Sequence, residues 1–524
     1  MKLSLPEDKF PYIFSLFYFV FNSFFISRVL ALTHDSIYYY DEILTRPHNL
    51  FPHHLLFTPF MSIFSGIIKL SGINSDLIAI SLVNTIAGSI IVIIIYKILR
   101  NNFNYTKTAS RIAVLICSFS FSFWFYNLNI ETYQLPMVFI FSAIYFLTRE
   151  PRRNTDLYIA AMLGGIGVLF HQLHGLFGLV AVVFLIISGV KKNLKQIIVF
   201  AIIFNVIWLA GYSIAIYYLE LKSFEDVSRW FFLYHHEMDG WSSFNSTFFI
   251  APLIGFLRSF VSINGLFINS TVSEFMFSYF KHQNLEDDAY IVRNVDSFEF
   301  YIYIILLLIL IGLILYAAVS NFPIIKQTFL KISNRIILVI LFLIYSGFFI
   351  FWAPVNLEFW IPQALVFWII FSASFNNTYS NKKNILVAVG IIIILFYVNF
   401  RYTIILTKDF DNDLYYSEVQ DARELLPPGS IIYYEHGWIL DKYYEIYAPE
   451  ITFISLDKNF IPQKQETSEK DLQIILKNHS ALFIQAGLEK NYLVSANDSV
   501  YQTELVRIGQ TDFIKYYLFE TNGN

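Results

Sequence analysis

The chain has 524 residues, of which 56% are hydrophobic, 19% aromatic and only 15% charged. Soluble domains carry charge at about a quarter of their positions, so this composition excludes a soluble globular protein and makes lipid the expected solvent. The formal net charge is -4, which gives no electrostatic basis for a nucleic-acid partner. The single cysteine, Cys117, excludes an intramolecular disulfide and a cysteine-rich zinc site.

Long apolar runs recur along the chain and predict an α-helical polytopic membrane protein with about eleven transmembrane helices. The first run has spanning length and no small-residue cleavage site follows it, so we interpret it as a retained helix and not as a signal peptide. The runs lie near residues 10–32, 77–96, 112–127, 134–148, 157–171, 175–190, 196–219, 300–319, 336–353, 361–375 and 384–404.

One further apolar run, Leu55 to Leu70, decides the topology. If this run lies in the membrane interface and does not cross, the basic loops all fall on the side of the N-terminus, as the positive-inside rule requires of cytoplasmic loops. We therefore expect a cytoplasmic N-terminus, in a bacterial inner membrane, with the polar chemistry on the extracytoplasmic face. The loops carry Lys97, Arg100, Lys107 and Arg111; Arg149, Arg152 and Arg153; Lys191, Lys192 and Lys195; Lys326, Lys331 and Arg335; and Lys382 and Lys383.

The predicted transmembrane domain covers residues 1–406, with an outer loop at 33–76 that carries interfacial helices and a long outer segment at 220–299. That segment contains another apolar stretch, Thr247 to Ile268. This stretch must lie on the surface or dip into the bilayer and return, because a single crossing would invert the basic loops that follow it.

The pattern changes in the last part of the chain. Pro427-Pro428-Gly429 precedes a region in which strand-like and helical patches alternate. We predict a small α/β domain at residues 407–524, on the extracytoplasmic side of the membrane.

Acidic residues follow the first predicted helix directly. A carboxylate at this place could act as a general base, and a nearby arginine or histidine could bind an anion or line a substrate site. The same residues could equally form a solvated loop whose acids only mark the end of a helix, and spacing alone does not decide between the two. The loop contains Asp35, Asp41, Glu42, Arg46, His53 and His54.

Four more polar residues interrupt apolar surroundings further along the chain. Glu131 is either a functional carboxylate, since burial of an unpaired charge is costly, or a turn acid among interfacial aromatic residues. His171 and His174 share a helical face, but two histidines without a third ligand favour hydrogen bonding or substrate contact over a metal site. Glu358 lies in a polar break, Pro354 to Trp360, that is either a plain turn or a cavity wall.

The order of these parts resembles the GT-C superfamily of polytopic glycosyltransferases, and most closely its protein O-mannosyltransferase-like branch. Asp35-Ser36 matches the Asp-Ser of that branch, and Pro52-His53-His54-Leu55-Leu56 is similar to its His-Pro segment. Trp124 with Glu131-Thr132-Tyr133-Gln134-Leu135 is similar to its Trp followed by Glu-Val-Tyr-x-Leu. The likeness covers about the first 180 residues and is fainter as far as Trp360. The chain departs from the pattern where Phe51-Pro52-His53-His54 replaces His-Pro-Pro-Gly, and where Asp41-Glu42 forms a second acidic pair.

The resemblance implies an inverting transferase that uses a polyprenyl-phosphate-linked sugar as donor and a hydroxyl of a protein, lipid or glycan as acceptor, with Asp35 in the place of the family's catalytic acid. Such a reaction needs a base, a cation for the departing phosphate and a pocket that excludes water. The cation could be Arg46, Arg258 or Arg401, although interfacial snorkelling is the plainer interpretation of each. No cofactor is required and no metal ligand is assigned, although Asp35 or Asp41 could hold Mg²⁺ or Mn²⁺.

Two other functions fit a polytopic chain. A lipid or solute transporter would show an internal repeat, paired broken helices and ionisable residues at mid-membrane, and the sequence contains no detectable repeat. A polysaccharide polymerase or ligase would place its key residues in a long late loop. The segment 220–299 with His235, His236, Arg258 and Arg293 could serve, but it leaves the early acidic loop unexplained.

Overall fold

A computed structural model of the chain describes residues 8–188, 190–232, 241, 250–279, 285–330, 334–376, 382–426, 428–429, 431–434, 439–455, 482–485, 505–510 and 515–519. The chain forms two compact units. Unit 1 contains Met1–Ser27 and Glu42–Lys408, and unit 2 contains Arg28–Asp41 and Asp409–Asn524. The segment Arg28–Asp41 lies within the predicted transmembrane domain of residues 1–406, but it contacts mainly the tail.

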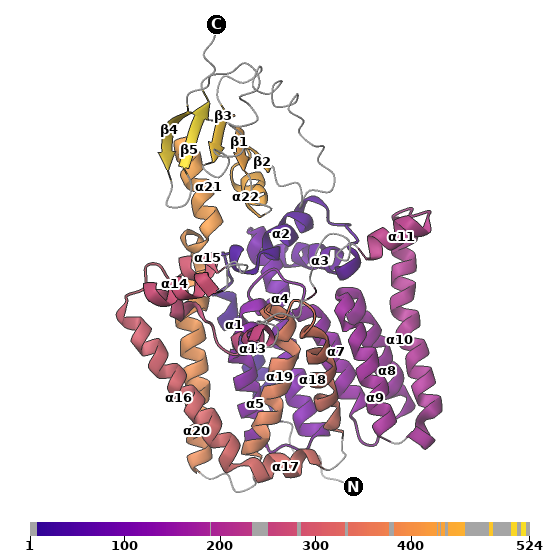
Figure 1. The fold of residues 1–524 in the computed structure, drawn as a ribbon. Helices are drawn as coiled ribbons and strands as arrows, with labels where there is room; N and C mark the ends of the chain where they lie inside the picture. Colours follow the sequence, from indigo (N-terminus) through magenta and orange to yellow (C-terminus); the bar gives the residue numbers. More distant parts are fainter. Residues whose placement is uncertain are drawn as a thin grey trace. The chain divides into compact units, whose positions relative to one another are not determined.

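Unit 1 is a bundle of helices (Figure 1). Helix α2 (Asp35–Thr45) begins in unit 2 and ends in unit 1. The other helices of the first half are α1 (Phe10–Ser23), α3 (Phe57–Lys69), α4 (Asp76–Lys97), α5 (Lys107–Phe119), α6 (Phe121–Asn127), α7 (Gln134–Leu147), α8 (Asn154–Phe170), α9 (Leu176–Ile187) and α10 (Val190–Tyr218). The later helices are α11 (Phe224–Phe231), α13 (Ile250–Arg258), α14 (Ser270–Tyr279), α15 (Glu286–Tyr290), α16 (Phe298–Ser320), α17 (Phe322–Leu330), α18 (Ile336–Phe349), α19 (Ile361–Phe371) and α20 (Lys382–Asn399).

Five helices in the described part of the chain are long and apolar enough to cross a membrane, or up to six if the bent pair of α5 and α6 is one span. Shorter apolar helices fall within the remaining predicted runs, so every predicted run contains an apolar helix. The structure thus supports an integral membrane protein, and the number of crossings stays a prediction. The five helices are Asp76–Asn102, Leu194–Tyr218, Phe298–Ser320, Leu357–Phe375 and Lys382–Lys408.

Helix α1 is shorter than the apolar run that predicted it. The run continues to Leu32, but the helix ends at Ser23 because the chain turns there. The amide of Phe25 donates to the carbonyl of Asn22 at 2.9 Å, and the amide of Ser27 donates to the carbonyl of Leu128 at 3.1 Å. Hydropathy could not locate this turn, since the residues on both sides of it are apolar.

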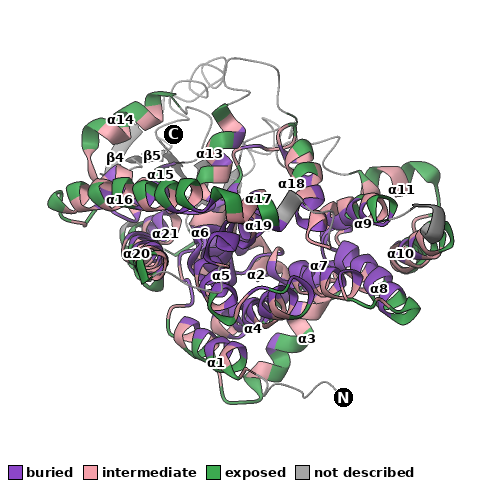
Figure 2. Ribbon diagram, turned by 90° about the horizontal axis from the view of Figure 1, so that it is seen from below, coloured by how far each residue is buried: buried purple, intermediate pink, exposed green. Residues whose placement is uncertain are grey.

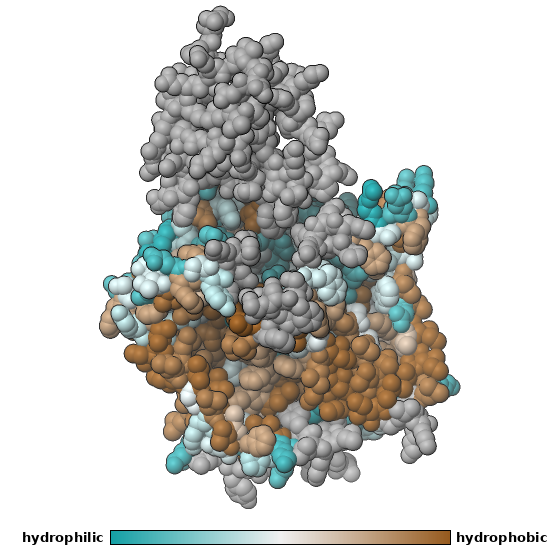
Figure 3. Space-filling view, viewed as in Figure 1, coloured by the Kyte–Doolittle hydropathy of each residue, from teal (hydrophilic) through white to brown (hydrophobic). Residues whose placement is uncertain are grey.

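The central helices of unit 1 are buried against one another, and the peripheral ones expose apolar side chains. The apolar stretch of the α4 span is 72% buried, whereas those of the α10 and α16 spans are only 17% buried. Figure 2 shows this contrast between the centre and the edge of the bundle. On the face drawn in Figure 3, apolar side chains form a band across the middle of the bundle, with hydrophilic residues towards its ends. Such a band is typical of a surface in contact with lipid.

The basic loops of unit 1 gather at one end of the bundle. Arg111 Nη2 lies 2.9 Å from Asp8, which lies just before α1. Arg335 Nε donates to the carbonyl of Phe103 at 3.1 Å. Asn334 Nδ2 donates to the carbonyl of Thr148 at 2.8 Å, and Gln196 Nε2 lies 3.4 Å from Asn154 Oδ1. These bonds join neighbouring connections that the sequence analysis placed on one side of the membrane.

Helix α3 does not cross the bundle. Just before it, the amide of Leu56 donates to the carbonyl of Leu169 at 2.9 Å, near the end of α8. At its other end, Lys69 Nζ lies 2.5 Å from Asp76, the first residue of α4. Because α4 runs from this end to the end with the basic loops, both ends of α3 lie opposite those loops.

The stretch Thr247 to Ile268 enters unit 1 and turns back within the described residues from Ile250 onward. It forms α13 and a 3-10 helix at Asn264–Ile268, joined by a turn in which Ser259 and Ser262 are fully buried. The turn lies against the break between α5 and α6, where the two helix axes bend by 63°. This path within unit 1 agrees with the second expectation, a stretch that dips in and returns.

The break between α5 and α6 and the turn after α13 form hydrogen bonds with each other, so backbone groups that have no partner within a helix are paired. The amides of Phe121 and Ser122 donate to the carbonyls of Phe260 and Ser259, both at 3.0 Å. Asn399 Nδ2 donates to the carbonyls of Phe119 and Phe260, at 2.8 and 3.1 Å. Irregular backbone at membrane depth is tolerated only where protein groups pair with it in this way.

Unit 2 combines the segment Arg28–Asp41 with two helices and a sheet of the tail. The helices are α21 (Leu414–Leu425) and α22 (Leu440–Tyr447), and the strands are β1 (Ile431–Tyr434), β2 (Thr452–Ser455), β3 (Leu482–Gln485), β4 (Leu505–Gln510) and β5 (Lys515–Phe519). The strand order is β2-β1-β3-β5-β4, with β1 parallel to β2 and β3, and β5 antiparallel to β3 and β4. Gly429 enables the turn before β1, since its φ is +86° and its amide donates to the carbonyl of Glu450 at 2.8 Å.

Candidate functional site

An irregular loop between α6 and α7 organises the polar end of unit 1. Asn84, in the middle of α4, donates from Nδ2 to the carbonyls of Asn129 and Glu131, at 2.9 and 2.7 Å. Gln134 Nε2 donates to the carbonyl of Phe123 at 3.0 Å. The Glu131 side chain is therefore carried by a fixed backbone, and only 1% of its surface is exposed.

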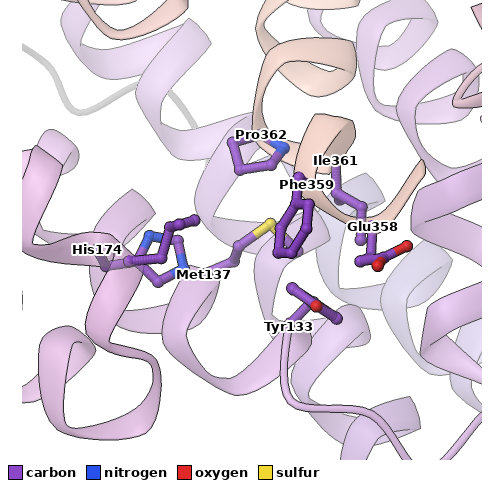
Figure 4. A pocket seen from close by; sticks show the side chains of 8 residues that line it. Tyr133, Met137, His174, Glu358, Phe359, Ile361 and Pro362 are labelled. Atoms are coloured by element: carbon purple, nitrogen blue, oxygen red, sulfur yellow. The ribbon is translucent and has the colours of Figure 1, made fainter. Parts of the chain in front are cut away.

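A small pocket lies beside this loop. Its empty space is about 220 Å³ when the open solvent at its mouth is included. Glu358 and His174 lie on opposite sides of it, with Met137 and Phe359 between them (Figure 4). The lining residues are Tyr133, Met137, Leu173, His174, Glu358, Phe359, Ile361 and Pro362.

Tyrosine hydroxyls hold both polar groups of the pocket. Glu358 Oε2 accepts a hydrogen bond from Tyr126 at 2.9 Å, and His174 Nδ1 lies 3.0 Å from the hydroxyl of Tyr345. A mainly apolar slot with a few oriented polar groups is the usual form of a site for a small polar ligand.

The four predicted histidines gather next to the pocket. The ring of His54 lies 4.5 Å from that of His171, and the ring of His171 lies 5.9 Å from that of His174. Burial lowers the pKa of His53 to about 4, and it lowers the pKa of His54 as well. Both rings are therefore neutral at physiological pH, so they can exchange hydrogen bonds with a ligand but contribute no positive charge to it.

His171 has a defined tautomer. Its Nδ1 accepts a hydrogen bond from the amide of Leu173 at 3.3 Å, which assigns the ring proton to Nε2. That Nε2 group is buried and has no hydrogen-bond partner among the described residues. A ligand oxygen could accept this bond.

The three candidate cations differ in their surroundings. Arg258 Nη2 lies 2.9 Å from Asp288 Oδ2, with side chains that are 14% and 12% exposed. Burial raises the pKa of Asp288, although the charge of Arg258 opposes the rise. The Nε of Arg258 is buried without a hydrogen-bond partner among the described residues. Arg401 is paired with Glu299 at 2.6 Å, and Arg46 is exposed.

The three candidate acids do not form one group. Asp35 is the first residue of α2 and partly exposed, in unit 2, where the positive end of the helix dipole favours a carboxylate. Asp41, also in unit 2, lies 3.1 Å from Lys442 Nζ. Glu42 belongs to unit 1, where it accepts a hydrogen bond from Asn49 at 3.0 Å.

Glu358 and His174, which line the pocket, are among the residues predicted from the sequence, but the groups that hold them are not. Asn84 and Tyr345 each lie within an apolar run, and a polar residue in such a place indicates a buried hydrogen bond. Asp288 and Lys442 carried no signal, because their partners are distant in sequence. In the described part of the chain, no group of three or more His, Cys, Asp or Glu side chains could hold a metal ion.

The residues of the alternative late-loop site are only partly described. His235 and His236 lie outside the described residues. Arg293 is exposed and stacks on the ring of Tyr290, with 3.7 Å between the guanidinium carbon and the ring centroid. No observation gathers these residues into a site.

Comparisons with known proteins agree with this architecture. Residues 58–218 match the family model described as dolichyl-phosphate-mannose-protein mannosyltransferase. The crystal structure of ArnT from Cupriavidus metallidurans in the apo state has a TM-score of 0.58 at 9% identity and covers 97% of each chain. The structure of ArnT bound to undecaprenyl phosphate has a TM-score of 0.57 at 10% identity, again over 97% of each chain.

The oligosaccharyltransferase of Archaeoglobus fulgidus in the apo form is less similar, with a TM-score of 0.47 at 12% identity, over 97% of this chain and 76% of the other. No curated protein sequence matches the chain. The chain therefore has the fold of the two ArnT structures, and its residues 58–218 are similar to the dolichyl-phosphate-mannose-protein mannosyltransferase family.

Proposed function

We propose that this protein is a membrane glycosyltransferase that moves a sugar from a polyprenyl-phosphate-linked donor to an acceptor hydroxyl of a protein, lipid or glycan. The observation that carries the proposal is the overlap between the matched segment and the pocket. Tyr133, Met137, Leu173 and His174 form one side of the pocket, and all of them lie within residues 58–218. The shared fold with ArnT, one structure of which contains undecaprenyl phosphate, supports a polyprenyl phosphate as the lipid part of the donor.

In the proposed reaction the Asp35 carboxylate takes the proton of the acceptor hydroxyl. The acceptor oxygen then bonds to the anomeric carbon of the sugar, and the bond between that carbon and the phosphate oxygen breaks. The polyprenyl phosphate leaves with the bonding electron pair. Because the acceptor oxygen attacks the face opposite the departing phosphate, the configuration at the anomeric carbon inverts. The reaction takes place on the extracytoplasmic face of a bacterial inner membrane and needs no cofactor.

Arg258 is the cation that receives the leaving phosphate. Its Nε–H group is a buried donor with no partner in the described chain, and an unpaired buried donor of a charged group is costly. A phosphate oxygen would supply the missing acceptor and form a charge-assisted hydrogen bond. Arg401 is less suited, because Glu299 already accepts from both its Nε and its Nη2.

The pocket between Glu358 and His174 receives a polar group of the sugar. The neutral histidines next to the pocket, the Tyr126–Glu358 bond and the Tyr133 and Phe359 rings suit a polar ring that carries hydroxyl groups. The buried His171 Nε2–H and the carboxylate of Glu131 supply further polar contacts at this end of the bundle.

The test uses purified protein with a polyprenyl-phosphate sugar labelled in the sugar. Asp35→Asn should lower kcat at least about 100-fold, because it removes the base without changing the shape of the side chain. Glu225→Gln changes an acid of α11 that is 84% exposed and serves as the matched control. Full activity of Asp35→Asn would remove Asp35 as the base.

The same assay separates the alternative functions. Label in a covalent product supports transfer, whereas label that only changes sides of a vesicle indicates a transporter. A protein that uses an oligosaccharide-pyrophosphate donor but no single-sugar donor is a polymerase or ligase.

A further inference from the structure

Charged groups of the tail contact the segment that carries the candidate base. Lys442 Nζ, in α22, lies 3.1 Å from Asp41 Oδ2, in α2, and the two side chains are only 15% and 10% exposed. Glu445 bonds the same ammonium group. The hydroxyl of Tyr38, also in α2, donates a hydrogen bond to Asp441 Oδ1 at 3.3 Å. All of these residues belong to unit 2.

A second contact fixes the beginning of the same segment. Asp413, which precedes α21, has no exposed surface. Its Oδ2 accepts hydrogen bonds from the amides of Leu30 and Ala31, at 2.7 and 3.2 Å, and from the hydroxyl of Tyr443 at 2.6 Å. Its Oδ1 accepts from the amide of Tyr416 at 3.0 Å, which caps α21. One carboxylate therefore joins the start of the acidic segment to both helices of the tail.

We infer that the tail of this chain holds the acid-bearing segment in place, and that Lys442 is the positioning residue that fixes helix α2 through its ion pair with Asp41. The inference rests on the proposed role of Asp35 and states how that residue is held. Asp35 lies in the same helix as Asp41, so a shift of α2 moves both carboxylates. Asp41 pairs with Lys442, and Asp35 is the first residue of the same helix.

The physical reason is the cost of leaving one member of a buried pair alone. Without Lys442, the Asp41 carboxylate would remain in a poorly solvated place without its cation, and α2 would move to rehydrate it. A displacement of about 1 Å at a reacting group can lower a rate about 100-fold. The tail would therefore affect the rate without touching the substrate.

The kinetic test compares Lys442→Met with Lys442→Arg. Lys442→Met should lower kcat about tenfold and leave the KM for the lipid donor within about twofold, because binding of the donor does not depend on α2. Lys442→Arg restores the positive charge and should recover most of the rate. Asp41→Asn should resemble Lys442→Met, and the double variant should be no slower than either single one, since both remove the same interaction.

Hydrogen–deuterium exchange of peptides within residues 28–41 gives a readout that is independent of activity. Exchange should rise in Lys442→Met and in Asp413→Asn. It should not rise in Arg423→Met, the matched control, which breaks the Arg423–Glu450 pair of the tail at 2.6 Å.

The outcomes separate the two claims. Unchanged exchange in Lys442→Met overturns the inference, and so does raised exchange with unchanged kcat. Raised exchange in Lys442→Met, with a wild-type protein that transfers no sugar from any donor, supports the holding role of the tail and removes the proposed function.

Discussion

At the scale of single residues, the partners of a side chain distinguish candidates that the sequence could not rank. In the sequence alone, Asp35, Asp41 and Glu42 are three acidic residues of one loop, and nothing ranks one above the others as the base. In the structure Asp41 is paired with Lys442 and Glu42 accepts from Asn49, whereas Asp35 is at the start of a helix. The residue types of the site could be predicted because polar groups stand out in an apolar chain. Their partners could not, since those partners lie far away in sequence.

Arg258→Gln should raise the KM for the lipid donor about tenfold, since it removes the charge that meets the phosphate. Arg258→Lys keeps the charge but loses the planar fork, so its KM should lie between the two. Initial rates over a range of donor concentrations measure both. Arg293→Gln is the matched control, because Arg293 is an exposed arginine of the same outer segment. An unchanged KM in Arg258→Gln would contradict the assignment.

Glu418, in α21, should make stability depend on pH. Burial raises its pKa to about 8, and its Oε1 has no hydrogen-bond partner among the described residues. The folded protein therefore keeps the proton between about pH 5 and pH 8 while the unfolded chain has lost it, so this group's contribution to stability falls as pH rises through that window.

The expected slope of that contribution is about 1.4 kcal/mol per pH unit at most. Glu418→Gln cannot ionise, so its unfolding temperature, relative to that of the wild type, should rise from pH 5 to pH 8. Thermal unfolding of the solubilised protein at several pH values measures this difference. A difference that stays constant with pH would show that Glu418 is not buried as a neutral acid.

At the scale of elements, hydropathy located the apolar helices but not their breaks. Composition and length are local properties, so each predicted run contains a helix. The end of α1 at Ser23, the bend at Ser120 and the return of the stretch after α13 depend on tertiary hydrogen bonds. No local pattern encodes such a bond, because its two partners come from different parts of the chain.

Asn399→Leu should destabilise the protein by about 2–4 kcal/mol, because it leaves buried carbonyl groups of the two breaks without a donor. The side chain also accepts from the amide of Ser262 at 2.9 Å. Asn384→Leu, in the same helix α20, removes a single hydrogen bond to Asn321 at 3.2 Å and serves as the control. Thermal unfolding in one detergent should show a clearly larger loss for Asn399→Leu; equal losses would contradict the role given to the breaks.

At the scale of the whole molecule, the gathering of the basic loops at one end of unit 1 agrees with the topology expected from charge. The sequence could predict this arrangement because the positive-inside rule counts residues and needs no contacts. It could not predict the two units, since Arg28–Asp41 looks like an ordinary loop after a helix. Its contacts with the tail, among them the bonds to Asp413, Asp441 and Lys442, assign it to unit 2.

Cysteine labelling tests the orientation, because Cys117 is the only native thiol and is buried. In intact cells an impermeant maleimide should label Arg229→Cys in α11, whose native side chain is 75% exposed. It should label Lys382→Cys, at the start of α20, only after the cells are permeabilised. The reverse pattern would place the pocket in the cytoplasm and contradict the proposed reaction.

The Asp413 carboxylate has a practical consequence for dissecting this chain. A shortened protein that stops at Lys408 would expose the amides of Leu30 and Ala31, which have their acceptor on a residue that the deletion removes. Deletion of the C-terminal part to obtain a smaller helical core would therefore also remove the hydrogen bonds that hold Leu30 and Ala31, close to the other end of the chain.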